Sequence, residues 1–575
     1  MEETAVPPEV IKLRLALLSA LGTLALFVFT LSADAMRPFF LNVSYYLMWA
    51  LVLAWGWALA RFLRKNGFTA KQSWEKNRLG LCLTLALTAA IFLSVKPGWR
   101  VLSDDTNLLG ISRSLVYEHQ PLNPTMGYNY YGNFQIKRSE LDKRPLLFPF
   151  LAHLLHLALG YSAINLFVLN FIAAWALLFL FYRVFEREAG PPGGMAASLL
   201  LASYPIFSLN ATGGGFDLLS TLFIALSLLT VWIYMQKPET EELDLLWFTL
   251  LMLANIRYES IIYLPVIFLL LWSWRRIADK MRLVLLALWT APLFLPTFWQ
   301  RLLSMGQHEQ PAGTSLFRFD SLVANLREML AGQLDFTLPY NNLANVAAFI
   351  CFEWLMVVLL RRRREDEDRL VFSTVAVAVV GLGLVISCAH FFVPTYSHAT
   401  GARLFLAFSA FCAFLTALFL LRVIRIPAWG ALGLALVLFG VYHPIAMERR
   451  FTNNLILVRT TDEVYNYLNT YADKHTLLVI DRPGQYAVLE RGAVNFKYAN
   501  SNAIDILNSA RRKLFSEILV AQEILYKTGL PKLEHKLDAA YKLETIYELQ
   551  NSGDTFLRIS RVTEDSLPPS GYAAL

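Results

Sequence analysis

The stretch "VLSDDTNLLGISRSLVYEHQ", from Val101 to Gln120, places two adjacent carboxylates, Asp104 and Asp105, directly after a long apolar run. Apolar residues follow the pair at helical spacing, so we expect a helix that begins near them. An acidic residue in the first turn can cap a helix and interacts favourably with its dipole. Because one acid is enough for a cap, the pair suggests a further role at the membrane surface.

The composition of the whole chain indicates an integral membrane protein. Of its 575 residues, 56% are hydrophobic and only 17% are charged, and the mean hydropathy is +0.45. Soluble proteins carry about 25% charged residues. The four cysteines lie inside apolar runs and show no disulfide or zinc spacing. The formal net charge of +7 is small and concentrated in a few loops, so we expect no nucleic-acid partner.

Candidate membrane spans recur along residues 1–444. A bilayer crossing needs about 20 apolar residues, and such runs lie near 15–33, 43–60, 79–96, 162–182, 194–210, 216–235, 282–303, 343–360, 369–392, 403–421 and 427–443. The run 246–274 is interrupted by "RYES", so we expect two half-helices that return to the same side. The shorter run 146–159 contains His153 and His156, and we expect an interfacial helix in which both histidines pack. The prediction is an α-helical polytopic membrane protein with about 11 to 14 transmembrane or re-entrant helices.

The distribution of basic residues predicts the orientation of these helices. Loops rich in Lys and Arg face the cytoplasm, and the richest are 61–78, 275–282, 361–369 and 422–425. With a cytoplasmic N-terminus, all four fall on the cytoplasmic side. The first apolar run lacks a small-residue cleavage site, so we expect it to remain as a helix. Loops 97–161, 305–342 and 393–402 and the C-terminal segment are then extracytoplasmic, in what we expect to be a bacterial inner (plasma) membrane.

Residues 445–575 differ in composition from the helical part and predict a small soluble α/β domain on the outer, periplasmic side. A helix is expected to open at Thr461 or Asp462, followed by the strand "TLLVI" at 476–480 and a turn at 481–484. The segment "DTFLRISRV" at 554–562 alternates like a second strand. The predicted organisation is therefore a membrane domain, 1–444, and a soluble domain, 445–575.

The predicted outer loop 97–161 carries side chains suited to a sugar phosphate. A carboxylate at the lip of an apolar cavity can accept a proton from a hydroxyl, and partial burial shifts its pKa toward that role. Aromatic rings stack on sugars and basic groups bind phosphate; the candidates are Tyr128, Tyr130, Tyr131, Lys137, Arg138, Lys143 and Arg144. The alternatives are an aromatic belt at the membrane interface and solvated loop charge.

The order of these features resembles the polytopic C-type glycosyltransferases (GT-C fold), which include protein mannosyltransferases and the enzymes that add aminoarabinose to lipid A. The resemblance rests on "SDDTNLLGISRSL", "KRPLLFPFLAHLLHLALG", the "IRYES" break and "GARLFLAF", and it covers roughly residues 80–445. In two respects the chain departs from the family. Two spans precede the one before the acidic loop, where the family usually has one, and Tyr258 stands where Pro is commoner. The Trp-Trp-Asp motif of oligosaccharyltransferases is absent.

The resemblance implies transfer of a hexose or pentose from a polyprenyl-phosphate donor to an acceptor hydroxyl, with inversion. The acceptor would be a lipid, a glycan or a protein outside the cytoplasm. One acid of the loop pair is the general base in this family, a role that maps to Asp104, with Asp105 as its neighbour or a metal contact. No cofactor is certain, and a divalent cation, Mg²⁺ or Mn²⁺, is left open. Arg403 is the candidate cation for the leaving phosphate, with snorkelling to the headgroups as the alternative.

Other residues are assigned to the same site as donor or substrate contacts. Arg257 and Glu259 lie in the helix break and would bind donor phosphate and substrate or, alternatively, pair with each other and brace the site. Asp217 follows the flexible "TGGG" and is either a second carboxylate of the site or a helix cap. Tyr396 and His398, in "VPTYSHATGAR", would contact donor or acceptor.

Two further classes of function share some of these features. A transporter or flippase of a lipid-linked sugar also has broken helices and charges within the membrane, but usually contains internal inverted repeats, and we find none in the sequence. A non-catalytic subunit of a cell-envelope glycan assembly system is the other alternative. Replacement of Asp104 by Asn distinguishes them, because only a glycosyltransferase should lose sugar transfer.

Overall fold

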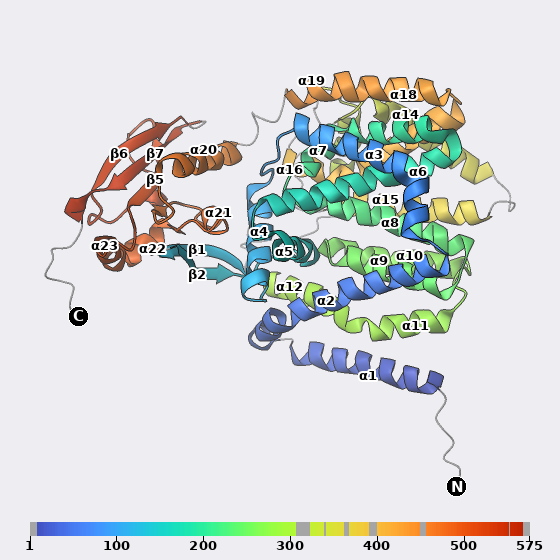
Figure 1. Cartoon of the computed structure of the whole chain (residues 1–575), viewed down its shortest axis with the longest axis horizontal. Coiled ribbons are helices and arrows are strands. Elements are labelled where there is room, and N and C mark those ends of the chain that lie inside the picture. Colours follow the sequence, from blue (N-terminus) through green and yellow to red (C-terminus); the bar gives the residue numbers. More distant parts are fainter. Residues whose placement is uncertain are drawn as a thin grey trace, which may run out of the picture. The chain divides into compact units, whose positions relative to one another are not determined.

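The computed structural model describes residues 8–30, 32–130, 132–305, 322–337, 341–361, 367–389, 399–448, 456–550 and 553–566. The chain forms two compact units (Figure 1). The helical unit comprises Met1–Gly98, Lys143–Leu154 and Leu166–Phe451, and the α/β unit comprises Trp99–Asp142, Leu155–Asn165 and Thr452–Leu575.

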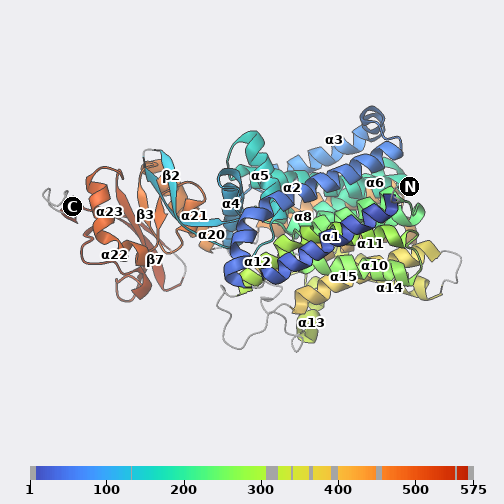
Figure 2. The same cartoon turned by 90° about the horizontal axis from the view of Figure 1, so that it is seen from below.

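The helical unit is built from apolar helices, as the sequence predicts. Eight helices among the described residues are long and apolar enough to cross a membrane, or nine if Lys280–Trp289 and Ala291–Ser304, bent by 58°, form one span. Helix α12 packs against α2, and α1 packs against α11 (Figures 1 and 2). The helices are α1 (Pro8–Phe29), α2 (Ala33–Lys65), α3 (Ala70–Ser94), α5 (Leu147–Leu159), α6 (Ile164–Ala202), α7 (Pro205–Ala211), α8 (Asp217–Gln236), α9 (Thr240–Ala254), α10 (Tyr263–Ser273), α11 (Lys280–Trp289), α12 (Leu295–Met305), α13 (Leu322–Gln333), α14 (Ala344–Arg361), α15 (Glu367–Ala389), α16 (Ala399–Ala402), α17 (Leu406–Leu418), α18 (Ala428–Val437) and α19 (His443–Glu448).

Helix α6 contains two predicted spans that fold back on each other. The chain turns at Gly190, whose φ of 69° is left-handed, and two prolines follow it. The two legs then pack closely. Ser198 Oγ donates to Leu178 O at 2.9 Å, and a Cβ at Gly194 would lie only 2.7 Å from Tyr182 O. A glycine is therefore needed where the two legs meet.

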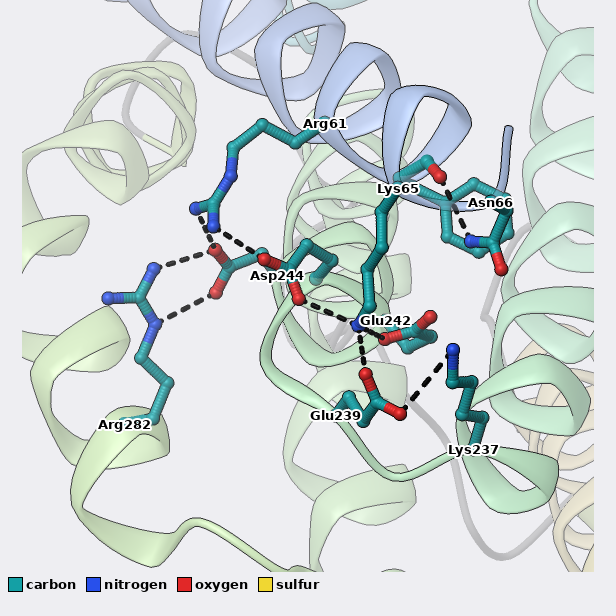
Figure 3. A network of polar contacts seen from close by, with 10 residues as sticks. Arg61, Lys65, Asn66, Lys237, Glu239, Glu242, Asp244 and Arg282 are labelled. Atoms are coloured by element: carbon teal, nitrogen blue, oxygen red, sulfur yellow. Dashed lines mark hydrogen bonds and ion pairs between the residues drawn. The ribbon is translucent and has the colours of Figure 1, made fainter. Parts of the chain in front are cut away.

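The predicted hairpin at 246–274 is present as α9 and α10. A short 3₁₀ turn, Tyr258–Ile262, precedes α10. Arg282, near the start of α11, donates to Asp244 Oδ2 at 2.6 Å, so the first turns of α9 and α11 lie together (Figure 3). Because α10 ends only a few residues before α11 begins, the α9–α10 pair returns to the side from which it started.

A network of ion pairs joins helix ends on this side (Figure 3). The carboxylates of Glu239, Glu241 and Glu242 have oxygen atoms within 4.8 Å of one another, a spacing that would suit a metal ion. The Lys65 ammonium occupies that position, with Nζ 2.8 Å from Glu241 and 3.0 Å from Glu242 and in contact with Glu239. Arg61 pairs with Glu241 at 2.7 Å. A lysine thus supplies the charge that these carboxylates need.

Further pairs link loops that were predicted to share one side. Arg276, just after α10, pairs with Asp368 of α15 at 2.7 Å. Arg422, in the π-helical end of α17, pairs with Glu188 near the turn of α6. The basic loops are thus tied by ion pairs to neighbouring helix ends, and their cytoplasmic location stays a prediction.

The α/β unit is organised around a seven-stranded mixed sheet of order β2-β1-β4-β3-β5-β7-β6. Strand β3 pairs in parallel with both β4 and β5. All the other strand pairs are antiparallel. Its elements are α4 (Leu102–Tyr117), β1 (Asn123–Tyr130), β2 (Asn133–Glu140), α20 (Ile456–Tyr471), β3 (Leu477–Val479), α21 (Gly484–Ala487), β4 (Ala493–Val494), α22 (Phe496–Ser501), α23 (Ala503–Arg511), β5 (Ile518–Leu525), β6 (Leu543–Leu549) and β7 (Thr555–Val562).

The two strands expected at 476–480 and 554–562 are present as β3 and β7. The helix expected to open at Thr461 or Asp462 begins earlier, at Ile456. The α/β unit is also larger than the predicted domain 445–575, because β1 and β2 come from the loop 97–161. Strand β1 joins the sheet by pairing Gly127 with Ala493 of β4. No local pattern reveals a pairing between segments so distant in sequence.

The central strands of the sheet are buried on both faces, whereas the edge strands β2 and β6 are mostly exposed. Successive side chains of a strand point to opposite faces. Accordingly, Leu477 and Val479 belong to one apolar cluster and Leu478 to the other. The first cluster includes Tyr128 of β1 and Phe515, and the second is completed by residues of α20, β5 and β7. Burial on both faces explains why β3 is a continuous apolar run.

Candidate functional site

Four charged side chains that the sequence assigns to one site meet in the helical unit. Arg403 Nη1 donates to Asp217 Oδ2 at 3.2 Å, and Arg257 Nη1 donates to Asp217 Oδ1. Arg257 also donates to Glu259 Oε1, from Nε at 3.1 Å and from Nη2 at 2.7 Å. Asp217 therefore bridges two guanidinium groups, and two cations face two carboxylates. We call these four residues the ionic cluster.

The position of Asp217 follows from the glycine-rich turn before α8. Asn170 of α6 donates through Nδ2 to Gly213 O at 2.7 Å and to Gly215 O at 2.8 Å, which holds the turn in place. The helix cap expected as an alternative is not observed. The N-cap residue of α8 is Phe216, without a side-chain hydrogen bond, and both oxygens of Asp217 accept from arginines.

The break between α9 and α10 positions Arg257 and Glu259. Its first residue, Asn255, is held by two contacts: its carbonyl accepts from Leu147 N at 3.1 Å, and its Oδ1 accepts from Thr297 Oγ1 at 2.9 Å. The backbone is therefore anchored where it leaves the helix. The two charged residues pair with each other, as the bracing alternative requires, and Arg257 additionally reaches Asp217.

The ionic cluster borders a small cavity of about 60 Å³ in the helical unit. Helices α8, α10, α15 and α17 contribute to its walls; the other polar or small lining residues include Ser220, Thr221, Ser260, Tyr263, Gly383 and Ser387. At Gly383 a Cβ would lie 2.5 Å from Tyr263 Oη, so the glycine makes room for the phenol. The cavity thus has charged groups on one side and apolar helix surfaces around it.

The location of the ionic cluster makes its pairing necessary. Asp217 is 4% exposed, and burying an unpaired charge costs several kcal/mol, on the order of 3–5 kcal/mol when one partner of a buried pair is removed. The ionic cluster begins α8, whereas the Lys65 network adjoins the other end of α8 through Glu239. The two charged groups therefore lie at opposite ends of the helices.

Asp104 and Asp105 lie in the first turn of α4, which belongs to the α/β unit, and both are buried. Asp105 Oδ2 accepts from the backbone N–H of Arg100 at 2.8 Å, so this acid stabilises the turn that leads into the helix. The helix expected after the acidic pair is present. A chemical role for Asp104 remains a proposal.

The tyrosines predicted to stack on a sugar are packed inside the protein. Tyr128 is 6% exposed, and its ring contacts those of Tyr130, Tyr498 and Phe515, with centroids 5.3 to 6.2 Å apart. Burial raises the pKa of Tyr128 and of Tyr130 above the usual value. Core packing accounts for both rings, and neither is used in the function proposed below. Tyr131 lies outside the described residues.

The remaining predicted residues are distributed over several places. Lys143 is exposed, whereas Arg144 is buried and its carbonyl accepts from Gln300 Nε2. Tyr396 and His398 fall outside the described residues. The packing expected for the two histidines of α5 is observed: His156 Nε2 lies 3.0 Å from Ser112 Oγ, and His153 Nε2 lies 3.4 Å from Tyr45 Oη.

Sequence reasoning missed two residues that support the ionic cluster. Asn170 orients the turn before Asp217, and Tyr263 lines the cavity beside Arg257. A signal for the first was present, since a polar amide inside an apolar span is costly unless it has a structural or functional partner. Tyr263 carried no such signal, because tyrosine is common in apolar helices.

Comparison with known proteins supports the resemblance seen in the sequence. The model of the dolichyl-phosphate-mannose-protein mannosyltransferase family matches residues 143–299. Among solved structures, ArnT from Cupriavidus metallidurans bound to undecaprenyl phosphate superposes with a TM-score of 0.54 at 10% identity, covering 86% of this chain and 100% of that chain. The oligosaccharyltransferase of Archaeoglobus fulgidus, in complex with Zn and sulfate, gives a TM-score of 0.45 at 12% identity and covers 85% of this chain and 74% of that one. No curated protein sequence is significantly similar to the chain.

The family model and the match to the ArnT structure confirm the predicted fold. The chain has the GT-C fold of polytopic membrane glycosyltransferases, with a mostly helical membrane part and a smaller α/β unit. The matched family segment contains three members of the ionic cluster, Asp217, Arg257 and Glu259.

Proposed function

We propose that this integral membrane protein is a glycosyltransferase that moves a sugar from a polyprenyl-phosphate donor to an acceptor hydroxyl outside the cytoplasm. The observation that carries the proposal is the ionic cluster within a GT-C fold. Two arginines are held at the end of apolar helices, where a lipid-linked phosphate can arrive from the bilayer. The ArnT structure with the same fold has undecaprenyl phosphate bound, which supports a polyprenyl-phosphate donor.

In the proposed reaction Asp104 removes the proton of the acceptor hydroxyl. The hydroxyl oxygen attacks the anomeric carbon and forms the new C–O bond, while the bond from that carbon to the phosphate oxygen breaks. The electron pair leaves with polyprenyl phosphate, and the configuration at the anomeric carbon inverts. A fixed cation stabilises the charge that develops on the leaving group, and Arg403 has this role, with Arg257 as the second candidate.

Asp217 neutralises the two arginines when no polyprenyl-phosphate donor is bound. With Glu259 it balances both guanidinium charges, so the ionic cluster is formally neutral. A phosphate that binds Arg403 through Nη1 competes with Asp217 Oδ2, which accepts from this atom at 3.2 Å. The contact from Arg257 to Glu259, with one distance of 2.7 Å, is independent of this exchange. Donor binding is therefore proposed to loosen the bond between Asp217 and Arg403 and to leave Arg257 in place.

The proposal is tested by mass spectrometry of envelope lipids and glycans in a strain that lacks the gene. Complementation with the wild type should restore a sugar modification, and complementation with Asp104→Asn should not. The amount of the Asp104→Asn protein in the membrane should equal that of the wild type, which shows that the variant folds. Unchanged modification in the Asp104→Asn strain would rule out this residue as the base. Loss of lipid-linked sugar export in the deletion strain, with transfer intact in membrane extracts, would instead favour a flippase.

A further inference from the structure

A second cavity, of about 240 Å³, lies within the α/β unit, and most of the residues that line it have polar side chains, although much of its surface is apolar. Helix α4, the hairpin of β1 and β2, and the segment around α21 form its walls. The lining side chains are Ser103, Thr106, Asn107, Asn123, Thr125, Met126, Arg138, Glu140, Arg482, Pro483, Gln485 and Asn495, together with Gly484. Hydroxyl and amide groups predominate, and these groups both donate and accept hydrogen bonds.

The amide of Asn123 is the part of this cavity that the fold itself does not explain. Asn123 is 7% exposed, and among the described residues nothing donates a hydrogen bond to its buried Oδ1. A buried polar atom without a partner costs stability unless a ligand or water satisfies it. Asn123 Oδ1 itself packs against the backbone of α4, where a Cβ at Gly110 would lie only 2.0 Å from it, so the amide faces the cavity with its remaining atoms.

The three charged residues that line the cavity are largely exposed, and each pairs with an oppositely charged residue. Arg138 pairs with Glu140 at 2.9 Å, and their side chains are 59% and 50% exposed. Arg482 lies 3.6 Å from Asp481 and is 56% exposed. The interior offers neutral amides and hydroxyls together with the apolar surfaces of Met126 and Pro483. This combination favours a neutral ligand that offers hydroxyl groups and an apolar ring face.

We propose that this cavity binds a neutral sugar ring of the acceptor, with the Asn123 amide as a principal contact. The volume is below the roughly 300–1,000 Å³ of pockets for drug-sized ligands, so it admits one ring rather than an oligosaccharide. Ser103, Thr106 and Asn107 of the cavity lie on α4, the helix that carries Asp104. The inference deepens the proposed function, since it identifies a hydroxyl-rich glycan as the acceptor class and the α/β unit as its binding site.

The test uses the full-length protein in lipid nanodiscs without donor. Saturation-transfer NMR with a panel of neutral methyl hexosides should detect binding by the wild type. In Asn123→Ala the affinity for the best hexoside should fall by about tenfold, as expected for loss of a buried hydrogen bond. The melting temperature should stay the same or rise, since the variant removes a buried atom that the protein leaves unsatisfied. A purely structural asparagine would instead lower it.

A matched control comes from the same strand. Asn129 is 5% exposed and also has a buried Oδ1 that accepts no hydrogen bond within the described chain, but it does not line the cavity. Its Nδ2 donates to Glu490 O at 3.2 Å. Asn129→Ala should therefore lose stability and keep hexoside binding. Ser103→Leu, which fills the cavity from an exposed position, should abolish binding, whereas Ser501→Leu, at an exposed position of α22 away from the cavity, should not.

The outcomes separate this inference from the proposed function. Absence of binding by every neutral hexoside, equal binding by Asn123→Ala, or binding of only methyl glucuronide or inorganic phosphate overturns the inference. None of these results bears on transfer, which is read separately with Asp104→Asn. Competition by a glycolipid in the nanodisc or by a soluble oligosaccharide supports the inference in either case and shows from which source the sugar comes.

Discussion

Asp217 Oδ2 accepts a hydrogen bond from Arg403 Nη1 at 3.2 Å, and this contact joins residues 186 positions apart in the chain. Its other oxygen accepts from Arg257. One carboxylate at the start of α8 therefore links the break between α9 and α10 to the beginning of α17. The contact matters because it keeps two partly buried guanidinium groups paired with a buried carboxylate at the end of apolar helices.

Replacing Arg403 by Gln should reduce sugar transfer by about 100-fold or more, because a fixed cation that stabilises the leaving phosphate contributes this much. The measurement is transfer from a lipid-linked donor by purified protein in nanodiscs. Arg422→Gln is the control, since Arg422 follows the same helix and pairs with Glu188 at its other end. Equal loss in both variants would indicate a general role of arginines in folding.

Replacing Asp217 by Ala should lower the free energy of unfolding by about 3 kcal/mol or more, because two arginines lose a buried partner. Thermal unfolding in detergent measures the change. Asp279→Ala is the comparison: Asp279 caps α11, with Oδ1 accepting from Arg282 N at 2.8 Å, and loss of a cap costs about 1 kcal/mol. A similar small loss at both positions would mean that Asp217 acts only at a helix end.

We expect Asp104 to act in the chemical step and Asp105 to stabilise the structure of α4. Asp104→Asn should abolish transfer and leave the melting temperature nearly unchanged. Asp105→Asn should weaken the contact to Arg100 N, lower the melting temperature by a few degrees, and retain measurable transfer. Both quantities come from the same purified samples. Loss of transfer in Asp105→Asn with unchanged stability would reverse the assignment.

The α/β unit should become less stable below about pH 6.5, the pKa of an unperturbed histidine. Burial lowers the pKa of His535, although the nearby carboxylates Asp481, Glu523 and Glu534 oppose the shift and Lys532 assists it. His535 Nδ1 accepts from Glu523 N at 3.0 Å, which requires the neutral ring. The unfolded state thus binds the proton first, and acid favours unfolding.

Hydrogen exchange of β5 in the full-length protein, corrected for the intrinsic effect of pH, measures this loss. His535→Gln should flatten the pH dependence between about pH 5 and 7, because no group then titrates at this position. A variant that keeps the full dependence would assign it to another residue.

Local patterns in the sequence determined most of the helical unit. Runs of about 20 apolar residues become helices because a chain in lipid must satisfy its backbone hydrogen bonds internally. The break at "IRYES" and the turn at "TGGG" were visible for the same reason, since charge and glycine interrupt such runs. The resemblance suggested Arg257, Glu259 and Arg403 and the glycine-rich turn suggested Asp217; the structure brings the four side chains into contact, and their role in the site stays a prediction.

The tertiary structure alone decided which distant segments meet. The side chains of β1 do not reveal the two-residue strand β4 as its partner, so the loop 97–161 gave no sign of entering the sheet. Tyr128 and Tyr130 looked available for a sugar and became core residues once the sheet buried them. The bridge by Asp217 and the amide of Asn123 likewise depend on neighbours far away in sequence. Helix formation follows the local pattern of apolar side chains, whereas pairing and burial depend on which surfaces the whole chain brings together.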